Sequence, residues 1–232
     1  MVSTRNHPSS FPPPDLSPTT KTLTRSTRSP RKGSWAHTPS TITLLWLLAS
    51  LPAVFWDTAY VLLRPHSMPN GSLHAPIFTP YALYGQVDYI YGEKAYKEHN
   101  GFTSAQASLN IVESAGYVGY LWVVWKYGEG EKRVLGGGWG GVACLVAFAL
   151  SVMTVSKTVL YWSNEFFSGF ENIGHNDPLS LLFLWIIPNG LWLVFPSYMM
   201  YEFARDILHG LAIASGDRSS KPARAVTPTK DE

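Results

Sequence analysis

Residues 108–125 read SLNIVESAGYVGYLWVVW, an apolar run of membrane-spanning length that contains one carboxylate, Glu113. An ionisable group at the centre of a membrane helix costs about 2.5–3.5 kcal/mol on insertion scales, so it usually faces a partner, a cavity or a substrate. Asn110, Glu113 and Tyr117 are spaced three and four residues apart, so they share one face of a helix. The stretch therefore predicts a transmembrane helix whose polar face points at protein or at a cavity.

The polar residues of this 232-residue chain are concentrated at its ends, although 46% of all residues are hydrophobic. A helix needs about 20 apolar residues to cross a bilayer. Four segments meet that length: residues 41–63, 105–125, 135–162 and 179–203. We therefore predict an all-α polytopic membrane protein whose residues 41–209 form a bundle of four transmembrane helices. The flanking residues 1–40 and 210–232 are polar and are predicted to be disordered cytosolic tails.

The placement of lysine and arginine predicts the orientation. These residues gather before the first apolar segment, between the second and third, and after the fourth. The positive-inside rule places those regions and both termini in the cytosol, and we expect an integral protein of the endoplasmic reticulum membrane. Loops 64–104 and 163–178 then face the lumen. The tyrosines of the first loop are interpreted as an interfacial cap rather than as substrate contacts.

Polar side chains in the other three segments lie at a depth similar to that of Glu113. At 1.5 Å per residue, Asp57 lies about 10 Å below the lumenal end of the first helix. Asn189 and Trp192 lie in the fourth segment. Lys157, five residues from the predicted end of the third segment, either extends to the interface or pairs with one of the two acids. This layer predicts an enclosed apolar pocket that contains a pair of carboxyl groups.

Two carboxyl groups in an apolar pocket cannot both ionise easily. Such a site can protonate an alkene or an epoxide, or it can bind an amine, because both tasks need the same two groups. We interpret Glu113 and Asp57 as the catalytic candidates. The residues expected to contact the substrate are Asn110, Tyr117, Asn189, Trp192 and Lys157.

The sequence gives no indication of a cofactor or a metal ion. Its single cysteine, Cys144, cannot form an intrachain disulfide or a thiolate cluster. There is no phosphate-binding loop, and the histidines of the predicted lumenal loops lack metal-ligand spacing. We therefore predict no cofactor, no metal and no nucleic acid as partners. The expected partners are a sterol or terpenoid, membrane lipid and a second copy of the chain in a homodimer.

Four stretches of the chain carry a resemblance to a known family. They are WDTAYVLL (residues 56–63), NIVESAGY (110–117), SGFENIGHNDPLSLLF (168–183) and PNGLWLVFP (188–196). In this order they resemble the emopamil-binding-protein family, the EXPERA domain shared by sterol 8,7-isomerases and the sigma-two receptor. The resemblance covers roughly residues 41–209. Its most specific part is the Asn-x-x-Trp-x-x-x-Pro pattern of the last helix.

The resemblance implies a four-helix membrane bundle with a sterol-like pocket. In the isomerases, acids of the first and second helices move a ring double bond by protonating one alkene carbon and deprotonating another. By motif, these acids correspond to Asp57 and Glu113, and the asparagine and tryptophan of the last helix correspond to Asn189 and Trp192. Ala53 occupies the position of an isomerase histidine.

Three functions stay open at this stage. The first is an isomerase or cyclase that protonates a sterol or terpenoid. The second is a non-catalytic binder of sterols, lipids or cationic amphiphiles of the sigma-two type, which Ala53 favours, as does an aspartate as the first acid. The third is a structural membrane subunit in which Asp57 and Glu113 only connect helices.

Overall fold

Helices dominate the computed structural model, which describes residues 35–216. Predictions about residues 1–34 and 217–232 lie outside the described residues. In chain order the elements are β1 (Ala36–His37), α1 (Thr41–Leu62), η1 (His74–Phe78), α2 (Pro80–Val87), η2 (Tyr89–Tyr91), α3 (Glu93–Lys97), α4 (Phe102–Tyr127), β2 (Leu135–Gly136), α5 (Gly137–Phe167), α6 (Pro178–Leu181), η3 (Leu182–Ile186) and α7 (Ile187–Ala214).

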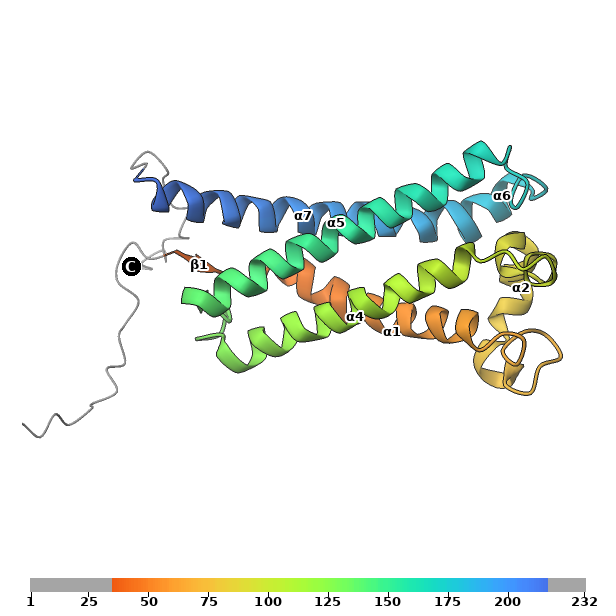
Figure 1. Ribbon diagram of the computed structural model, residues 1–232, viewed down its shortest axis with the longest axis horizontal. Coiled ribbons are helices and arrows are strands. Elements are labelled where there is room, and N and C mark those ends of the chain that lie inside the picture. Colours follow the sequence, from red (N-terminus) through yellow and green to blue (C-terminus); the bar gives the residue numbers. More distant parts are fainter. Residues whose placement is uncertain (1–34, 217–232) are drawn as a thin grey trace, which may run out of the picture. The chain divides into compact units, whose positions relative to one another are not determined.

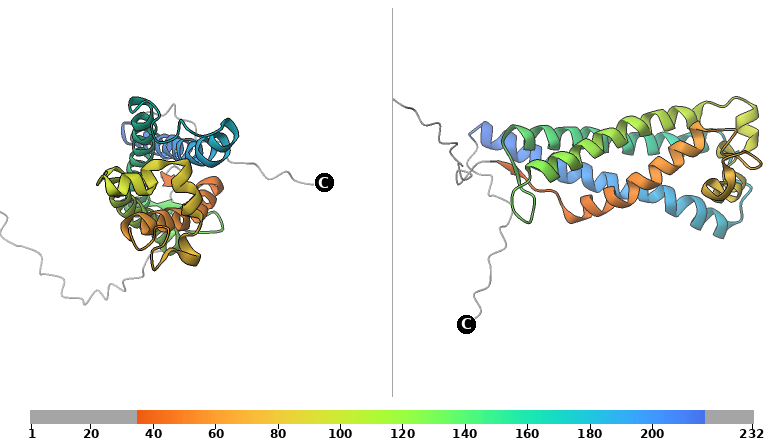
Figure 2. Two further views of the ribbon diagram at one scale, coloured as in Figure 1. Left: turned by 90° about the vertical axis from the view of Figure 1, so that its right-hand side faces the viewer. Right: turned by 90° about the horizontal axis from the view of Figure 1, so that it is seen from below.

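Four long helices, α1, α4, α5 and α7, run lengthwise beside one another (Figure 1). α4 packs between α1 and α5, and α5 packs along α7, whereas α1 meets α7 only over a short stretch. The segment with α2 and α3 lies across one end of these helices, and β1 lies at the opposite end (Figures 1 and 2). We call the first end the cap end and the second the strand end.

Three helical segments are long and apolar enough to cross a membrane: Thr41–Leu62, Gly137–Phe167 and the continuous run Pro178–Ala214. This finding is compatible with an integral membrane protein, as the sequence predicts. The helix α4 has 26 residues but does not meet the same criterion of apolarity, because Thr103, Ser104, Gln106, Ser108, Asn110 and Glu113 occupy its first half. The count of four spanning helices is therefore not confirmed by length and composition.

Helix boundaries follow from local chemistry. The Ser40 side chain accepts a hydrogen bond from the Thr43 amide at 3.0 Å and so caps the start of α1. Asp177 accepts bonds from the amides of Leu179 and Ser180 and precedes Pro178, a residue that fits the first helical position. These caps explain why the first and last apolar runs begin as helices close to the predicted residues.

Two predicted boundaries need correction at the strand end. Residues 35–40, assigned from the sequence to a disordered tail, are structured, because β1 pairs antiparallel with β2 and His37 is buried. The final helix continues to Ala214 rather than ending at residue 203. The two regions contact each other, since Trp35 donates a hydrogen bond to the Asp206 carbonyl at 2.7 Å and joins the chain before α1 to the end of α7.

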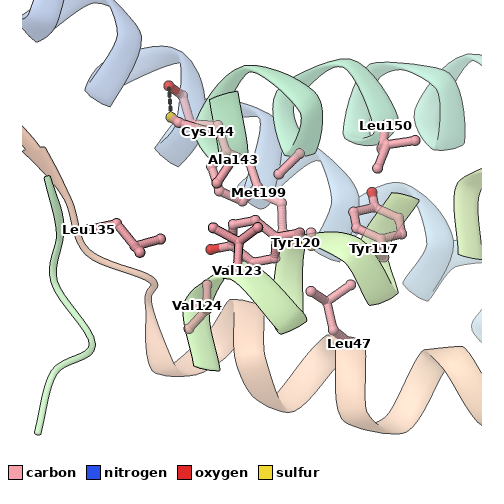
Figure 3. Close-up of a cluster of buried hydrophobic side chains, with 12 residues drawn as sticks. Leu47, Tyr117, Tyr120, Val123, Val124, Leu135, Ala143, Cys144, Leu150 and Met199 are labelled. Atoms are coloured by element: carbon pink, nitrogen blue, oxygen red, sulfur yellow. Dashed lines mark hydrogen bonds between the residues drawn. The ribbon is translucent and has the colours of Figure 1, made fainter. Parts of the chain in front are cut away.

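The largest buried cluster lies toward the strand end, where Leu47, Tyr120 and Met199 bring together α1, α4 and α7 (Figure 3). α4 approaches α5 closely at Gly116, where an added Cβ atom would lie 2.6 Å from the Leu150 side chain. A larger residue at position 116 would therefore require the Leu150 side chain to shift. This packing holds the strand-end halves of the helices together, so that a cavity can form nearer the cap.

Candidate functional site

A cavity of about 450 Å³ lies between the helices toward the cap end. All four long helices and the cap contribute to its wall. Most of the site residues predicted from the sequence line it, namely Asp57, Asn110, Glu113, Lys157, Asn189 and Trp192. Its volume falls in the range of about 300–1,000 Å³ that is typical of small-molecule sites. The depth argument from sequence thus brought together residues that the structure also brings together.

Tyr117 is the predicted site residue that the structure places elsewhere. It lines a much smaller neighbouring space rather than the main cavity. Its hydroxyl lies 3.3 Å from the Ser151 hydroxyl, inside the contact between α4 and α5. Tyr117 is one helical turn nearer the strand end than Glu113, and the packing of Gly116 against Leu150 closes the cavity there. Tyr117 therefore lies beside the cavity and not in its wall, and its contact with a ligand stays a prediction.

Glu113 and Lys157 form a buried ion pair in the cavity wall. The Lys157 Nζ atom lies 2.8 Å from Glu113 Oε2, and the two side chains are only 11% and 5% exposed. The Thr154 hydroxyl donates to the same oxygen at 3.2 Å, and Lys157 also donates to Asn110 Oδ1. These contacts favour the carboxylate form of Glu113, because a buried charge costs less when it is paired and hydrogen-bonded.

The structure decides between the two readings of Lys157. α5 ends at Phe167, five residues beyond the predicted end at residue 162. Lys157 therefore lies ten residues from the end of its helix, or about 15 Å at 1.5 Å per residue. Its Nζ atom pairs with Glu113 Oε2 inside the protein at 2.8 Å, so the structure shows the ion pair and not a side chain that extends to an interface.

Asp57 has a different set of partners. The Tyr81 hydroxyl donates a hydrogen bond to Asp57 Oδ1 at 2.8 Å, and the Tyr81 ring stacks on Tyr60 with centroids 3.7 Å apart. Within residues 35–216, no lysine or arginine forms an ion pair with Asp57. The two predicted acids thus line one cavity with different partners, and only Glu113 has a cationic one.

Aromatic side chains from the cap form one wall of the cavity. Tyr81, Tyr84 and Tyr91 line it together with Trp56, and Trp56 donates to the Ile77 carbonyl at 2.9 Å. The interpretation of these tyrosines as an interfacial cap alone is corrected, because the chain after α1 folds back over the ends of the helices and turns their rings inward. Periodicity could not reveal this, since the cap contains only short helical turns.

A wide helical turn positions the residues from the last helix. Pro188 has no amide hydrogen, and the turn before it, η3, is closed by a bond from the Ile187 amide to the Leu182 carbonyl. Asn189 and Trp192 follow on the cavity side. The Asn189 side chain donates to the Trp185 carbonyl at 2.9 Å, which fixes its orientation.

Part of the cavity wall is exposed on α1 and on α7. Ala53 on α1 and Pro188 on α7 both line the cavity, and both are exposed. The two helices come together nearer the strand end, where Trp46 stacks on Phe195 with centroids 4.5 Å apart. The structure therefore does not confirm the predicted enclosure of the pocket.

Glu113 also presents an unsatisfied acceptor. Its Oε1 atom is buried and has no hydrogen-bond partner within residues 35–216. Buried polar atoms are almost always paired in folded proteins, so an unpaired carboxylate oxygen beside a cavity indicates a place for a donor or a positive charge on a ligand.

A buried aspartate that sequence reasoning missed anchors the cap to the helices. Asp88 is fully buried and accepts hydrogen bonds from the Ile90 amide at 3.1 Å and from Trp185 Nε1 at 2.8 Å. The Tyr161 hydroxyl donates to it as well. These bonds connect the cap to α5 and to the start of the last helix. No sequence motif predicts the role of Asp88, because its side-chain partners Tyr161 and Trp185 are distant from it along the chain.

The protonation of Asp88 should make stability depend on pH. Burial raises the pKa of Asp88 from 3.8 to about 6, although its bonds from Tyr161 and Trp185 act in the opposite direction. The folded protein therefore holds this proton more tightly than the unfolded chain does. The resulting stabilisation is fully present below about pH 4 and is lost as the pH rises through about 6, a change of about 3 kcal/mol.

This dependence can be measured from thermal unfolding in detergent between pH 4 and pH 7. We expect the unfolding midpoint of the wild type to fall across this range more steeply than that of Asp88→Asn, which cannot titrate. The comparison is between slopes, because the amide nitrogen replaces one of the two acceptor oxygens and so disturbs the bond from Ile90 or the bonds from Tyr161 and Trp185. Parallel slopes for the two proteins would contradict the assignment.

Comparisons of the chain with protein-family models, curated proteins and solved structures found no match. The chemistry of the site is therefore inferred from its geometry. That geometry consists of an apolar cavity, a Glu113 that is paired with Lys157, an acid without a cationic partner at Asp57, and a wall of aromatic rings.

Proposed function

We propose that this chain is a membrane-embedded isomerase or cyclase that protonates an alkene of a sterol or terpenoid. The observation that carries the proposal is the different surroundings of two carboxyl groups on one cavity, Glu113 paired with Lys157 and Asp57 without a cation. When two acids have environments that favour different protonation states, the protonated one acts as the proton donor and the ionised one as the negative charge. Asp57 is the acid that donates, and Glu113 is the permanent negative charge.

The reaction balances with these two groups alone. Asp57 transfers its proton to one alkene carbon, which leaves a carbocation on the substrate and a carboxylate on the protein. The aromatic rings of the cavity and the Glu113 carboxylate stabilise the cation. Asp57 then recovers a proton from a neighbouring carbon, and a double bond forms at a new position. In a cyclase, a second alkene attacks the cation before that proton leaves.

The proposal places four helices across the membrane, with α4 as the additional one. α4 packs between α1 and α5, both of which are long and apolar enough to span. Its Asn110 and Glu113 are buried toward the cavity, whereas Ile111, Val112 and Val118 are exposed. An apolar outer face and a polar inner face are what lipid on one side and a cavity on the other require. Cytosolic termini and the endoplasmic reticulum are part of the same proposal.

Entry of the substrate from lipid fits the exposed part of the cavity wall on α1 and α7. A sterol or terpenoid is concentrated in the bilayer, and the exposed rim residues Ala53 and Pro188 belong to two proposed spanning helices. The resemblance of the chain to the emopamil-binding-protein family supports the same substrate class.

The proposal is tested by expressing the chain in yeast that lacks its own sterol 8,7-isomerase. The membrane lipids are profiled by mass spectrometry for sterols and for added terpenoid precursors. We expect a product whose mass equals that of its precursor, because isomerisation and cyclisation add no atoms. If the protein is abundant in membranes and no lipid changes, the catalytic proposal is rejected.

The second candidate function is non-catalytic binding of a cationic amphiphile or a hydroxylated lipid. It is favoured by the pairing of Glu113 with Lys157, which leaves Asp57 as the one cavity acid without a cation partner in residues 35–216. A single free carboxyl group beside aromatic rings suits one ammonium or hydroxyl group. Binding of a labelled cationic amphiphile that is weakened by Asp57→Asn, without any change in lipids, would select this function.

A further inference from the structure

Three potential metal ligands meet at the strand end, far along the helices from the cavity. They are His37 on β1, Cys144 on α5 and Asp206 on α7, and their ligand atoms all lie within 4.8 Å of one another. His37 and Cys144 are buried, and Asp206 is partly exposed. We propose that these residues bind a divalent transition-metal ion of the zinc class, which joins the segment before α1 to α5 and α7.

The ligand atoms, which all lie within 4.8 Å of one another, can reach the spacing of a tetrahedral zinc site by shifts of about 1 Å. The bonds of zinc to nitrogen and oxygen are about 2.0–2.2 Å and those to sulfur about 2.3 Å, so neighbouring ligand atoms lie about 3.3–3.6 Å apart. His37 Nδ1 and Asp206 Oδ2 are 2.8 Å apart. Less than about 1 Å of movement opens this pair to an ion. The Asp206 side chain, at 23% exposure, has room to move.

A second residue already orients the histidine as metal sites require. The Tyr120 hydroxyl lies 2.9 Å from His37 Nε2, and Tyr120 is buried in the core of the strand end (Figure 3). Histidine ligands usually bond through their second ring nitrogen to a neighbouring polar group, which fixes the ring. With Nδ1 on the metal, Nε2 carries the proton and donates it to the tyrosine oxygen.

The charges of the cluster balance a divalent ion. Cys144 binds as a thiolate after releasing its proton to solvent, and Asp206 is a carboxylate, so the two negative charges match a dication. Cys144 at present donates only a weak bond, to the Phe203 carbonyl at 3.6 Å (Figure 3). The neighbouring cation, Arg205, lies 4.0 Å from Asp206 Oδ1 but is paired with Glu202 at 2.9 Å. Its closer partner is therefore Glu202 and not the Asp206 carboxylate.

The sequence alone does not predict this metal site, because prediction from sequence depends on ligands that lie close together along the chain. The present three residues are 107 and 62 positions apart (144 − 37 and 206 − 144). Only the pairing of β1 with β2 and the packing of α5 on α7 bring them together.

The experiment uses cobalt as a spectroscopic substitute for zinc. The full chain is purified without a polyhistidine tag, kept reduced in detergent, and titrated with Co²⁺. We expect a thiolate-to-cobalt charge-transfer band that saturates at one ion per chain and disappears when Zn²⁺ is added. Cys144 is the only cysteine of the chain, so this band reports the proposed site and no other.

Variants separate the ligands from their surroundings. Cys144→Ser should abolish the band, and Tyr120→Phe should weaken cobalt binding by about 10–100-fold. His66→Gln, in an exposed histidine of the cap, is the matched control and should leave the titration unchanged. Size-exclusion profiles show whether each variant is folded. The wild-type titration decides by itself, because a folded, reduced protein without the band overturns the proposal whatever the variants do.

Discussion

Replacing Lys157 with methionine should lower the free energy of unfolding by about 3–5 kcal/mol, since removal of one partner leaves a buried charge uncompensated. The substitution breaks the ion pair between Lys157 and Glu113, which is nearly inaccessible to solvent. The Lys157 Nζ atom lies 2.8 Å from Glu113 Oε2. Equilibrium unfolding in mixed micelles of a mild detergent and SDS measures the loss. Adding Glu113→Gln to Lys157→Met should recover most of it, because the double variant has no unpaired charge.

An exposed pair of the same length provides the control. Lys97 and Glu93 also lie 2.8 Å apart, but their side chains are 70% and 72% exposed. Lys97→Met should change the free energy of unfolding by about 0.5 kcal/mol or less, as is usual for surface pairs. The interpretation of the cavity fails if Lys157→Met is as harmless as Lys97→Met, or if the double variant is no more stable than the single one.

The long helices could be predicted because apolar runs of sufficient length leave few alternatives. Hydropathy identified the three segments that the structure also shows as long and apolar enough to span. Hydropathy could not identify α4 as a spanning helix by the same criterion, because the polar residues that line a cavity make the helix less apolar. The feature that makes α4 functionally interesting is thus the one that weakens its signal.

The depth of the site residues along the helices could be predicted from the sequence, but their ion-pair and hydrogen-bond partners could not. Counting residues from the helix ends brought Asp57, Glu113 and Asn189 to one level, and they line one cavity. Whether Lys157 pairs with an acid depended on the true end of α5, five residues beyond the apolar run. The bond of Tyr81 to Asp57 depended on how the cap folds. Neither the end of α5 nor the folding of the cap produces a periodic pattern of apolar residues in the sequence.

The strand end illustrates a second limit. β1 and β2 have two residues each and pair across about a hundred positions, and such short strands leave no alternation to detect. The burial of His37 follows from this pairing and from the length of α7. A proline-rich and serine-rich neighbourhood therefore led to the prediction of a tail where the structure shows an ordered contact.

Changing Asp57 to asparagine should abolish the proposed reaction while leaving the fold intact. The amide carbonyl can still accept the bond that Tyr81 donates to Asp57 Oδ1, so the cavity wall keeps its shape. It has no acidic proton to give to an alkene. Loss of a general acid typically lowers the rate by about 10²–10⁴-fold. Product formation in membranes, measured by mass spectrometry at equal protein levels, should fall by at least about 100-fold.

Tyr81→Phe is the control that separates the acid from its environment. This variant removes the hydroxyl donor but keeps the Asp57 carboxyl group, so the rate should fall by about tenfold, the value of one hydrogen bond. Equal losses in the two variants would mean that Asp57 acts only by organising the cap, and full activity in Asp57→Asn would transfer the role of acid to another group. A smaller loss for Tyr81→Phe than for Asp57→Asn is the pattern that only a proton donor at Asp57 produces, because a residue that merely fixes the cap tolerates the isosteric amide better than the missing hydroxyl.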